Sequence, residues 1–149
     1  MSKLSALVLN GPNLNLLGVR EPGLYGSVTY QGLVELVQGW AEELGIEVEC
    51  FQSNHEGALL DRIHEARGRH RFLVFNPGAY THTSIALRDA LAGTAVPCLE
   101  VHLTNIYARE EFRRHSMVSP VCAGVIGGLG VLGYRLALEA GVQLFGAAE

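Results

Sequence analysis

LSALVLN at residues 4–10 and EVECFQS at residues 47–53 together decide the fold. Both are short, β-rich apolar runs, and near-continuous runs of this kind are typical of strands buried on both faces of a parallel sheet. Between them, residues 28–45 carry apolar side chains at helical spacing and end at Gly45, where a helix stop signal belongs. A strand, a helix and a second strand in this order predict a parallel βαβ unit.

The same alternation continues along the rest of the chain. Further strand-like runs are RFLVFNP, VPCLEVHL and AGVIGGL, and further helices are expected at about residues 57–67, 83–92, 109–115 and 128–140. The last helix is apolar around most of its circumference, so it lies either deep in the fold or at a subunit interface. Five strands alternating with helices predict an α/β fold with a doubly wound parallel sheet in the order 2-1-3-4-5. We expect residues 1–149 to form a single domain.

Composition and charge exclude several classes of protein. The chain has 149 residues, of which 48% are hydrophobic, enough for one sizeable core. A formal net charge of -4 provides no basic surface for nucleic acid. No apolar run reaches the roughly 18 residues of a membrane span. The chain enters its first strand at once, without a signal peptide's cleavage region, and we therefore expect a cytoplasmic location.

Cysteine and lysine usage narrow the chemistry further. Cys50, Cys98 and Cys122 include no CxxC pair, and an odd number argues against a disulfide framework. We expect them to be reduced packing residues. Lys3 is the only lysine, whereas a catalytic Schiff base needs a desolvated amine beside the substrate. Imine chemistry is therefore close to excluded.

Polar side chains follow four of the predicted strands, and ligands of doubly wound sheets bind outside the carboxyl ends of the strands. The four groups are NGPNLNLLGVREPGLYG at 10–26, QSNHE at 52–56, NPGAYTH at 76–82 and EVHLTN at 100–105. Glu100 and His102 are two residues apart, so they point to the same face of the sheet. A carboxylate in that position can fix the imidazole tautomer and raise its proton affinity, as general acid catalysis requires.

Several runs of the sequence resemble those of the type II 3-dehydroquinate dehydratases. They are LNGPNLNLLGVREPGLYG, QSNHEG, NPGAYTHTSIALRDAL, EVHLTN and REEFRRHS, and they recur in order over nearly the whole chain. The resemblance implies a flavodoxin-like fold and a homododecamer built as a tetramer of trimers. It also implies the dehydration of 3-dehydroquinate to 3-dehydroshikimate in the shikimate pathway, without a metal or cofactor.

The resemblance implies roles for individual catalytic residues. Tyr25 corresponds to the base that removes a proton from the carbon next to the substrate ketone, and Arg20 to the cation that stabilises its phenolate. Asn13 corresponds to the group that holds a water against the enolate oxygen. His102, supported by Glu100, corresponds to the acid that protonates the departing hydroxyl. We expect the loop that carries Arg20 and Tyr25 to close over the substrate.

Substrate-binding residues follow from the same resemblance. Those implied to bind the hydroxyls are Asn76, His82 and Arg113. The backbone amides of Leu103 and Thr104 would hold the substrate carboxylate. Asp89 corresponds to a position that reaches into a neighbouring subunit's site. Thr104 stands where many relatives carry Ser, and Arg114 where His is expected, departures that concern affinity rather than reaction type.

Two alternative functions remain open from the residues themselves. GLGVLG at 128–133 satisfies GxGxxG between a strand and a helix, a context that supports dinucleotide binding. No strand or ribose-binding acid follows at the expected distance of about 20 residues, so we interpret these glycines as close helix–strand packing. The second alternative is a non-catalytic flavodoxin-like binding module. Such a module would not need Tyr25, Arg20 and His102 together.

Single site residues also have structural interpretations. Tyr25 alone is compatible with a partly buried aromatic residue, His82 with a helix cap, and Asp89 with an exposed helix face. The other histidines are too scattered along the chain for metal-ligand spacing. Of these, His64 and His70 are expected at the surface.

Overall fold

The computed structural model describes residues 3–19 and 28–146. Within these residues five strands form one sheet in the order β2-β1-β3-β4-β5, as predicted. The strands are β1 (Ser5–Asn10), β2 (Glu47–Gln52), β3 (Phe72–Asn76), β4 (Cys98–His102) and β5 (Gly124–Gly127). All neighbouring strands run parallel, so their carboxyl ends meet at one edge of the sheet.

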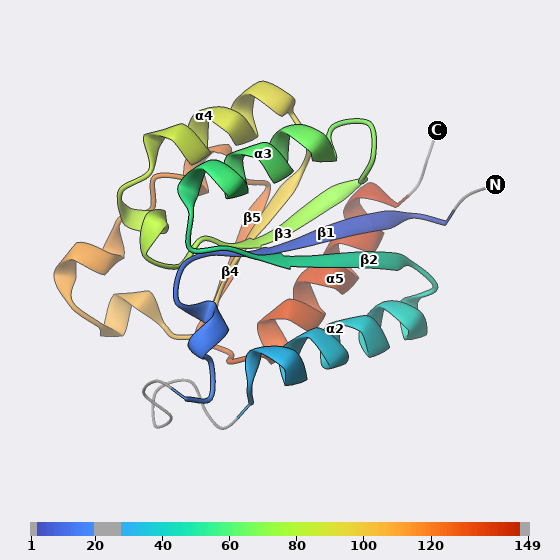
Figure 1. Cartoon of the computed structure of the whole chain (residues 1–149), viewed down its shortest axis with the longest axis horizontal. Helices are drawn as coiled ribbons and strands as arrows, with labels where there is room; N and C mark the ends of the chain where they lie inside the picture. The colour runs from blue at the N-terminus through green and yellow to red at the C-terminus, as the bar shows by residue number, and fades with distance from the viewer. Residues whose placement is uncertain (1–2, 20–27, 147–149) are drawn as a thin grey trace.

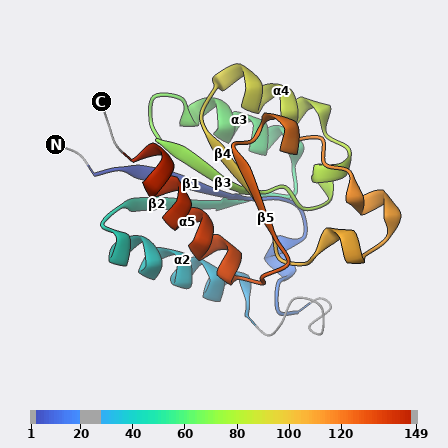
Figure 2. The same cartoon turned by 180° about the vertical axis from the view of Figure 1, so that it is seen from behind.

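Helices cover both faces of the sheet, as Figure 1 and Figure 2 show. The pair α2 (Tyr30–Leu44) and α5 (Leu132–Phe145) packs on one face, and α3 (Glu56–Ala66) with α4 (Ile85–Thr94) packs on the other. Alternate residues of β1 serve the two cores, because successive strand side chains point to opposite faces. Val8 packs with α2 and α5, whereas Leu9 packs with α3 and α4.

Burial differs between the central and the edge strands. The central strands β1, β3 and β4 are buried on both faces, as their apolar runs predict. The same prediction is wrong for β2 and β5, which form the two edges of the sheet and are partly exposed. Val125 on β5, for example, exposes 51% of its surface. An apolar run reports the hydrophobicity of a strand but not its place in the sheet.

Capping residues explain where α2 begins and ends and where α4 begins. The Thr29 hydroxyl accepts a hydrogen bond from the backbone N–H of Gly32, which starts α2 two residues inside the predicted range. The helix ends before Gly45, whose left-handed conformation closes it as the sequence predicts. Ser84 caps α4 in the same way, by accepting from the N–H of Leu87.

Other helical segments differ from the expectation. α5 begins at Leu132 rather than near residue 128, because Gly128 and Gly130 have positive φ angles that a helix does not accommodate. The helix expected at 109–115 is one short 3-10 turn, η4 (Glu111–Arg114). Three further 3-10 turns follow the carboxyl ends of β1, β3 and β4; they are η1 (Leu14–Leu16), η2 (Gly78–His82) and η3 (Ile106–Ala108). A last one, η5 (Ser119–Val121), precedes β5.

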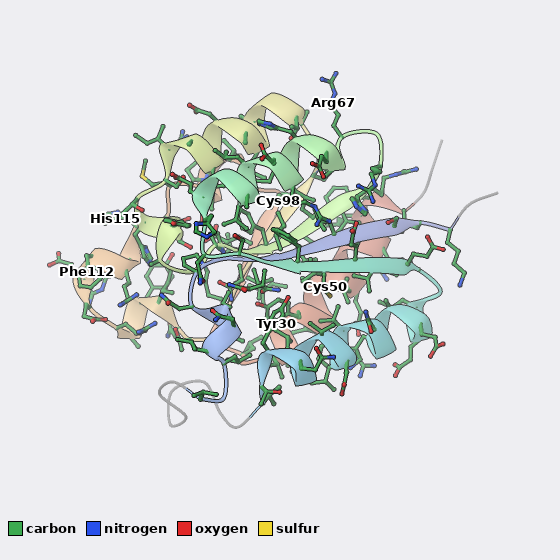
Figure 3. All side chains as sticks on the ribbon, in the orientation of Figure 1. Tyr30, Cys50, Arg67, Cys98, Phe112 and His115 are labelled. Atoms are coloured by element: carbon green, nitrogen blue, oxygen red, sulfur yellow. The ribbon has the colours of Figure 1, made fainter. Side chains whose placement is uncertain are left out.

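The cysteines are free thiols, as predicted. Cys98 is buried beneath α3 and α4, and Cys122 is partly buried beside the same core. Cys50 lies with Tyr30 between the sheet and α2, where both are labelled in Figure 3. Burial raises the pKa of the Cys50 thiol to about 11, so it behaves as a packing residue. Among the residues that the structure describes, no helix is long and apolar enough to cross a membrane.

Candidate active site

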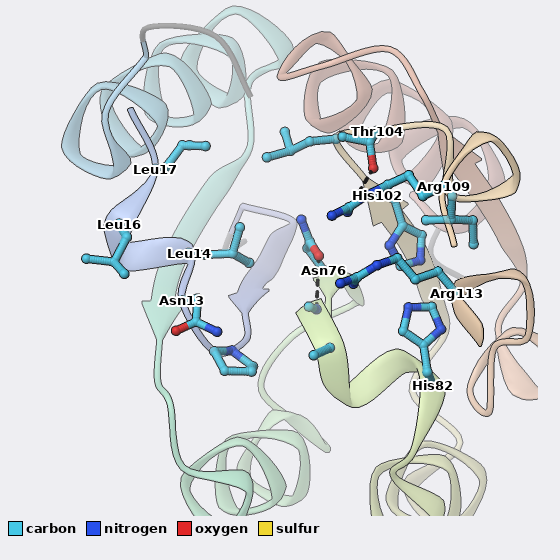
Figure 4. A pocket seen from close by; sticks show the side chains of 15 residues that line it. Asn13, Leu14, Leu16, Leu17, Asn76, His82, His102, Thr104, Arg109 and Arg113 are labelled. Atoms are coloured by element: carbon cyan, nitrogen blue, oxygen red, sulfur yellow. Dashed lines mark hydrogen bonds between the residues drawn. The ribbon is translucent and has the colours of Figure 1, made fainter. Parts of the chain in front are cut away.

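A cavity of about 270 Å³ opens at the carboxyl edge of the sheet (Figure 4). The segment after β1 forms one wall, with Asn13 and the apolar side chains of η1. The end of β4 and the turns that follow it form the opposite wall, which carries His102, Arg109 and Arg113. Asn76, at the end of β3, lies between the two walls. The cavity therefore lies where the doubly wound topology predicts a ligand.

The charge of the polar wall favours an anionic ligand. Arg109 and Arg113 both line the cavity, with His82 and His102 beside them. In the part of the chain that the structure describes, no Asp or Glu lines it. Guanidinium groups stay charged at any working pH and bind carboxylates and hydroxyls through several N–H donors.

Glu100 and His102 form the pair that their spacing predicts. His102 Nε2 lies 2.5 Å from Glu100 Oε2, and Glu100 is fully buried. Burial acts to raise the pKa of the Glu100 carboxyl, but hydrogen bonds from His102, Ser119 and Ser116 outweigh it, and the pKa lies below its ordinary value. An ionised carboxylate only accepts, so Nε2 carries the proton. Nδ1 is then the ring nitrogen that remains for a ligand in the cavity.

His82 has the opposite arrangement of its ring nitrogens. Its Nδ1 lies 2.8 Å from the backbone carbonyl oxygen of His115, which only accepts, so Nδ1 carries a proton. Burial lowers the pKa of His82, and the nearby charges of His102 and Arg113 lower it further, while the hydrogen bond to His115 opposes them. His82 therefore favours the neutral form, in which Nε2 can accept a hydrogen bond from a hydroxyl.

A chain of buried hydrogen bonds orients Asn76. Its Oδ1 accepts from the backbone N–H of Gly78 at 3.1 Å, and its Nδ2 donates to the Tyr134 hydroxyl at 3.0 Å. That hydroxyl donates to Asn10 Oδ1 at 2.5 Å, and Asn10 in turn bonds the hydroxyl of Tyr30. A backbone N–H can only donate, so the direction of the whole chain is fixed. One Nδ2 hydrogen of Asn76 is left for the cavity.

The segments that follow β1 and β3 pack backbone against backbone. The N–H of Gly11 donates to the carbonyl oxygen of Asn76 at 2.8 Å. A Cβ at Gly11 would lie 2.3 Å from the carbonyl oxygen of Pro77, so only glycine fits. Gly78, with a φ of 63°, makes the reciprocal contact, because a Cβ there would lie 3.0 Å from the carbonyl oxygen of Pro12. The two segments therefore form one continuous part of the cavity lining.

Residues at the end of β2 and just after it support the cavity instead of lining it. Asn54 Oδ1 accepts from the backbone N–H of Asn13 at 3.0 Å and from Gln52 Nε2 at 3.1 Å. Gln52 Nε2 also donates to the carbonyl oxygen of Gly11 at 3.1 Å. These bonds hold Asn13 in a left-handed conformation, which asparagine tolerates better than most residues. Gln52 and Asn54 therefore hold the segment after β1 in place from the side that faces away from the cavity.

The structure brings most of the predicted site residues together. Those that line the cavity are Asn13, Asn76, His82, His102, Leu103, Thr104 and Arg113, and Glu100 lies directly behind His102. Asp89 is exposed on α4 and is not among the described residues that line the cavity of its own chain. Arg20 and Tyr25, with the loop expected to close over the substrate, lie outside the described residues. The roles of all these residues stay predictions.

Two residues of the site, Arg109 and Tyr134, were not expected from the sequence. Arg109 lines the cavity, with its Nη1 3.5 Å from Thr104 Oγ1. Its position in REEFRRHS, four residues before Arg113, was an available signal. Tyr134 was missed because it lies in an apolar helix, although a tyrosine there needs a partner for its hydroxyl.

Two other sequence interpretations have clear outcomes. The packing interpretation of GLGVLG is confirmed for Gly133, since a Cβ there would lie 3.4 Å from the side chains of Ile126 and Val101. It is wrong for Gly130, where no atom lies within 4 Å of an added Cβ. The surface placement is confirmed for His64 but wrong for His70, whose side chain is only 5% exposed. Its Nδ1 and Nε2 bond Ser5 and Glu49 at the amino end of the sheet. No group of three or more metal-ligating side chains occurs in residues 3–19 and 28–146.

The fold and the site together define a class of protein. It is a small α/β enzyme with a doubly wound sheet, a buried carboxylate–imidazole pair and a cationic cavity suited to proton transfer on an anionic substrate.

Comparisons with known proteins give the family. Residues 4–142 match the family model for Dehydroquinase class II. The chain is 58% identical over 135 residues to catabolic 3-dehydroquinase 2 of Aspergillus flavus, covering 91% of this chain and 90% of that protein. It is 58% identical over 139 residues to 3-dehydroquinate dehydratase of Methylococcus capsulatus, covering 93% and 94%. The type II dehydroquinase structure from Butyrivibrio crossotus matches with a TM-score of 0.92 at 48% identity, covering 93% and 97%.

The chain belongs to the class II dehydroquinase family, the type II 3-dehydroquinate dehydratases, which are hydro-lyases. The resemblance seen in the sequence is thereby confirmed. Both the dinucleotide-binding and the non-catalytic alternatives are set aside by this membership.

Proposed function

We propose that this chain removes water from 3-dehydroquinate to give 3-dehydroshikimate, through an enolate and without a metal or cofactor. The observation that carries the proposal is the buried Glu100–His102 pair, which opens on a cavity lined by Arg109 and Arg113. The pair supplies a proton donor, and the guanidinium groups favour binding of the anionic substrate.

Proton removal is the first step. The Tyr25 phenolate takes the proton from the carbon next to the ketone, and Arg20 stabilises that phenolate, as the match of GVREPGLYG to the family supports. The electron pair moves onto the ketone oxygen to form the enolate. A water held by the Asn13 amide donates a hydrogen bond to that oxygen. Asn13 stands on the wall opposite His102, which supports this division of roles (Figure 4).

Loss of the hydroxyl is the second step. As the enolate collapses, the carbon–oxygen bond to the hydroxyl breaks, and His102 transfers a proton to the departing oxygen, which leaves as water. The donor is Nδ1, because Nε2 is bound to Glu100. The Glu100 carboxylate stabilises the imidazolium that donates the proton.

Substrate binding uses the remaining polar groups of the cavity. Asn76 donates its free Nδ2 hydrogen to one substrate hydroxyl, His82 accepts from another through Nε2, and Arg113 donates to a hydroxyl. The hydrogen bonds of Asn76 and His82 to the protein support these directions. The backbone amides of Leu103 and Thr104 hold the substrate carboxylate at the end of β4.

Assembly completes the site in this proposal. The protomer is a single domain, and twelve form a tetramer of trimers in which Asp89 reaches into a neighbour's site. The exposure of Asp89 on α4, away from its own cavity, supports this. Val125 and Leu132 expose 51% and 48% of their surface, as residues at a subunit interface do in an isolated chain.

We also propose a cytoplasmic location. The free thiols of the chain support it, because a reducing compartment keeps cysteines in this state.

The named relatives include catabolic 3-dehydroquinases and 3-dehydroquinate dehydratases at equal identity. The proposed reaction is therefore the shikimate-type dehydration of 3-dehydroquinate.

The test mixes chelator-treated protein with 3-dehydroquinate and follows the ultraviolet absorbance of the enone product. Wild type and His64→Ala, a control at an exposed histidine of α3, should turn over without added metal. Tyr25→Phe and His102→Ala should lose about 10²- to 10⁴-fold in kcat, the range for a general acid or base. No turnover by an intact wild-type oligomer would refute the function, and full activity of His102→Ala would refute its role as the acid.

A further inference from the structure

Two serines contact the carboxylate behind the catalytic histidine. The chain passes from η4 to η5 through residues 115–118, beside the end of β4. Ser116 Oγ lies 3.0 Å and 3.2 Å from the two oxygens of Glu100. Ser119 Oγ donates to Glu100 Oε1. Together with His102, these hydroxyls give one fully buried carboxylate three hydrogen-bond donors.

The direction of the Ser116 hydrogen bond is fixed by its own turn. Ser116 Oγ accepts from the backbone N–H of Val118 at 3.2 Å and of Ser119 at 3.0 Å. A hydroxyl has two lone pairs and one hydrogen. Because both lone pairs are engaged by amides, the hydrogen is directed at Glu100. The turn thus acts on Glu100 as a donor only.

A carboxyl group in this environment has to be ionised. A neutral carboxyl would bring a hydrogen of its own into a site already filled with donors, whereas donors to the charged form stabilise it. Few charged groups other than His102 affect the ionisation of Glu100. The neighbours of Glu100 in the register, Phe75 and Val125, carry none. The titratable groups near it are Cys98 and His102 on β4 and His82 on η2, and Arg88 of α4 bonds the carbonyl of Met117.

We propose that Ser116 and Ser119 are positioning residues for the acid step: their hydroxyls keep Glu100 ionised and directed at His102 Nε2, so that His102 presents Nδ1 to the cavity. The inference rests on the proposed function, in which His102 is the acid. The backbone of the same segment holds His82 through the carbonyl of His115. One short segment therefore sets the tautomer of both histidines of the cavity.

Ser119→Ala is the cleaner of the two test variants. Ser116→Ala would also leave two backbone amides without their acceptor, whereas the described hydrogen bonds show the Ser119 hydroxyl acting on Glu100 alone. Ser119→Thr keeps the hydroxyl. Ser5→Ala is the matched control, because the Ser5 hydroxyl bonds His70, which pairs with Glu49 at the amino end of the sheet, away from the cavity.

Ser119→Ala should lower kcat by roughly tenfold, the loss expected for one hydrogen bond to a charged group. KM should change by less than about twofold, since Ser119 does not line the cavity in the described structure. The acid limb of the kcat–pH profile should move to higher pH, because loss of a donor raises the pKa of Glu100. Ser119→Thr should restore the wild-type kcat and kcat–pH profile, and Ser5→Ala should leave both at the wild-type values.

A double-mutant cycle separates positioning from a general structural effect. In the Glu100→Gln background, Ser119→Ala should change kcat by less than about twofold, because the hydroxyl acts through the carboxylate. The same tenfold loss in both backgrounds, or an unchanged kcat and pH profile in Ser119→Ala, would overturn the proposal.

A spectroscopic measurement that does not depend on turnover tests the role of the serines separately from the proposed function. In ¹⁵N NMR spectra of histidine-labelled protein, His102 should show a protonated Nε2 in wild type, and the Ser116→Ala/Ser119→Ala variant should show a changed tautomer. An inactive wild type would refute the proposed function alone. An identical His102 signal in both proteins would refute the role of the serines, whether or not the enzyme turns over.

Discussion

The Tyr134 hydroxyl on α5 accepts a hydrogen bond from Asn76 Nδ2 at 3.0 Å and so connects the last helix to the cavity. Tyr134 is fully buried, and burial raises its pKa well above the ordinary value. The hydroxyl therefore stays protonated and donates to Asn10. A helix that covers one face of the sheet thereby fixes the orientation of a side chain in the site.

Tyr134→Phe should weaken both the fold and substrate binding. The change leaves Asn10 Oδ1 and one Asn76 hydrogen without partners in a buried place, which costs about 1–3 kcal/mol of unfolding free energy. KM should rise because Asn76 loses its fixed orientation. Denaturant unfolding and steady-state kinetics measure the two effects. Tyr80→Phe is the control, since its hydroxyl bonds the exposed carbonyl of Asn54, and it should cost less than about 1 kcal/mol.

Gly141→Ala should destabilise the protein through overpacking. A Cβ at Gly141 on α5 would lie 2.1 Å from the ring of Phe72, which is itself fully buried. We expect a loss of about 1–3 kcal/mol in unfolding free energy. Gly39→Ala on α2 is the matched helical control. No atom lies within 4 Å of the added Cβ, so this change should stabilise by about 0.5–1 kcal/mol. Equal effects of the two variants would contradict the packing argument.

His70 should make stability depend on pH. Burial lowers the pKa of His70 below its ordinary value of 6.5, the attraction of Glu49 opposes this, and Arg69 and Arg62 support it. The unfolded chain then binds the proton more readily, so stability is lost as the pH falls through 6.5. His70→Gln should flatten the decline in unfolding free energy between pH 7.5 and pH 5, by at most about 1.4 kcal/mol per pH unit. Parallel curves for the two proteins would refute this assignment.

Asp89→Asn should impair catalysis without dissolving the oligomer, if Asp89 completes a neighbour's site as proposed. Loss of a charged hydrogen bond to substrate or to a substrate-binding group costs about tenfold or more in kcat/KM. The chain has only one other aspartate, Asp61 on α3, and Asp61→Asn is the control. Sedimentation should give the same mass for both variants. Wild-type kinetics in Asp89→Asn, or an active wild-type monomer, would contradict the shared site.

The alternation of apolar runs predicted the sheet order and its layers, because burial between helices requires those runs. The apolar runs did not predict the features that depend on local backbone geometry. The start of α5 depends on the positive φ angles of Gly128 and Gly130, and the 3-10 turns depend on contacts between segments. The exposure of β2 and β5 depends on their places at the edges of the sheet.

The site was predictable where it is local in sequence. The spacing of Glu100 and His102 gives their contact, since a strand returns to the same face every two residues. The supporting groups were not predictable, because they come from distant segments: Ser116 and Ser119 lie 16 and 19 residues from Glu100 in the sequence, and Tyr134 lies 58 from Asn76. Only the folded chain brings such donors and acceptors together.

Gly11 and Gly78 leave no room for a side-chain atom between the two segments that carry Asn13 and Asn76. The spacing of these two segments is thus set by main-chain contact, whereas side chains of η1 and of the opposite wall occupy the remaining space of the cavity. Ligand selectivity can therefore change in evolution through the lining side chains of η1 and of residues 104–113, while the two Gly–Pro contacts keep the segments in place. Relatives that accept a larger or smaller acid should differ there and keep both Gly–Pro contacts.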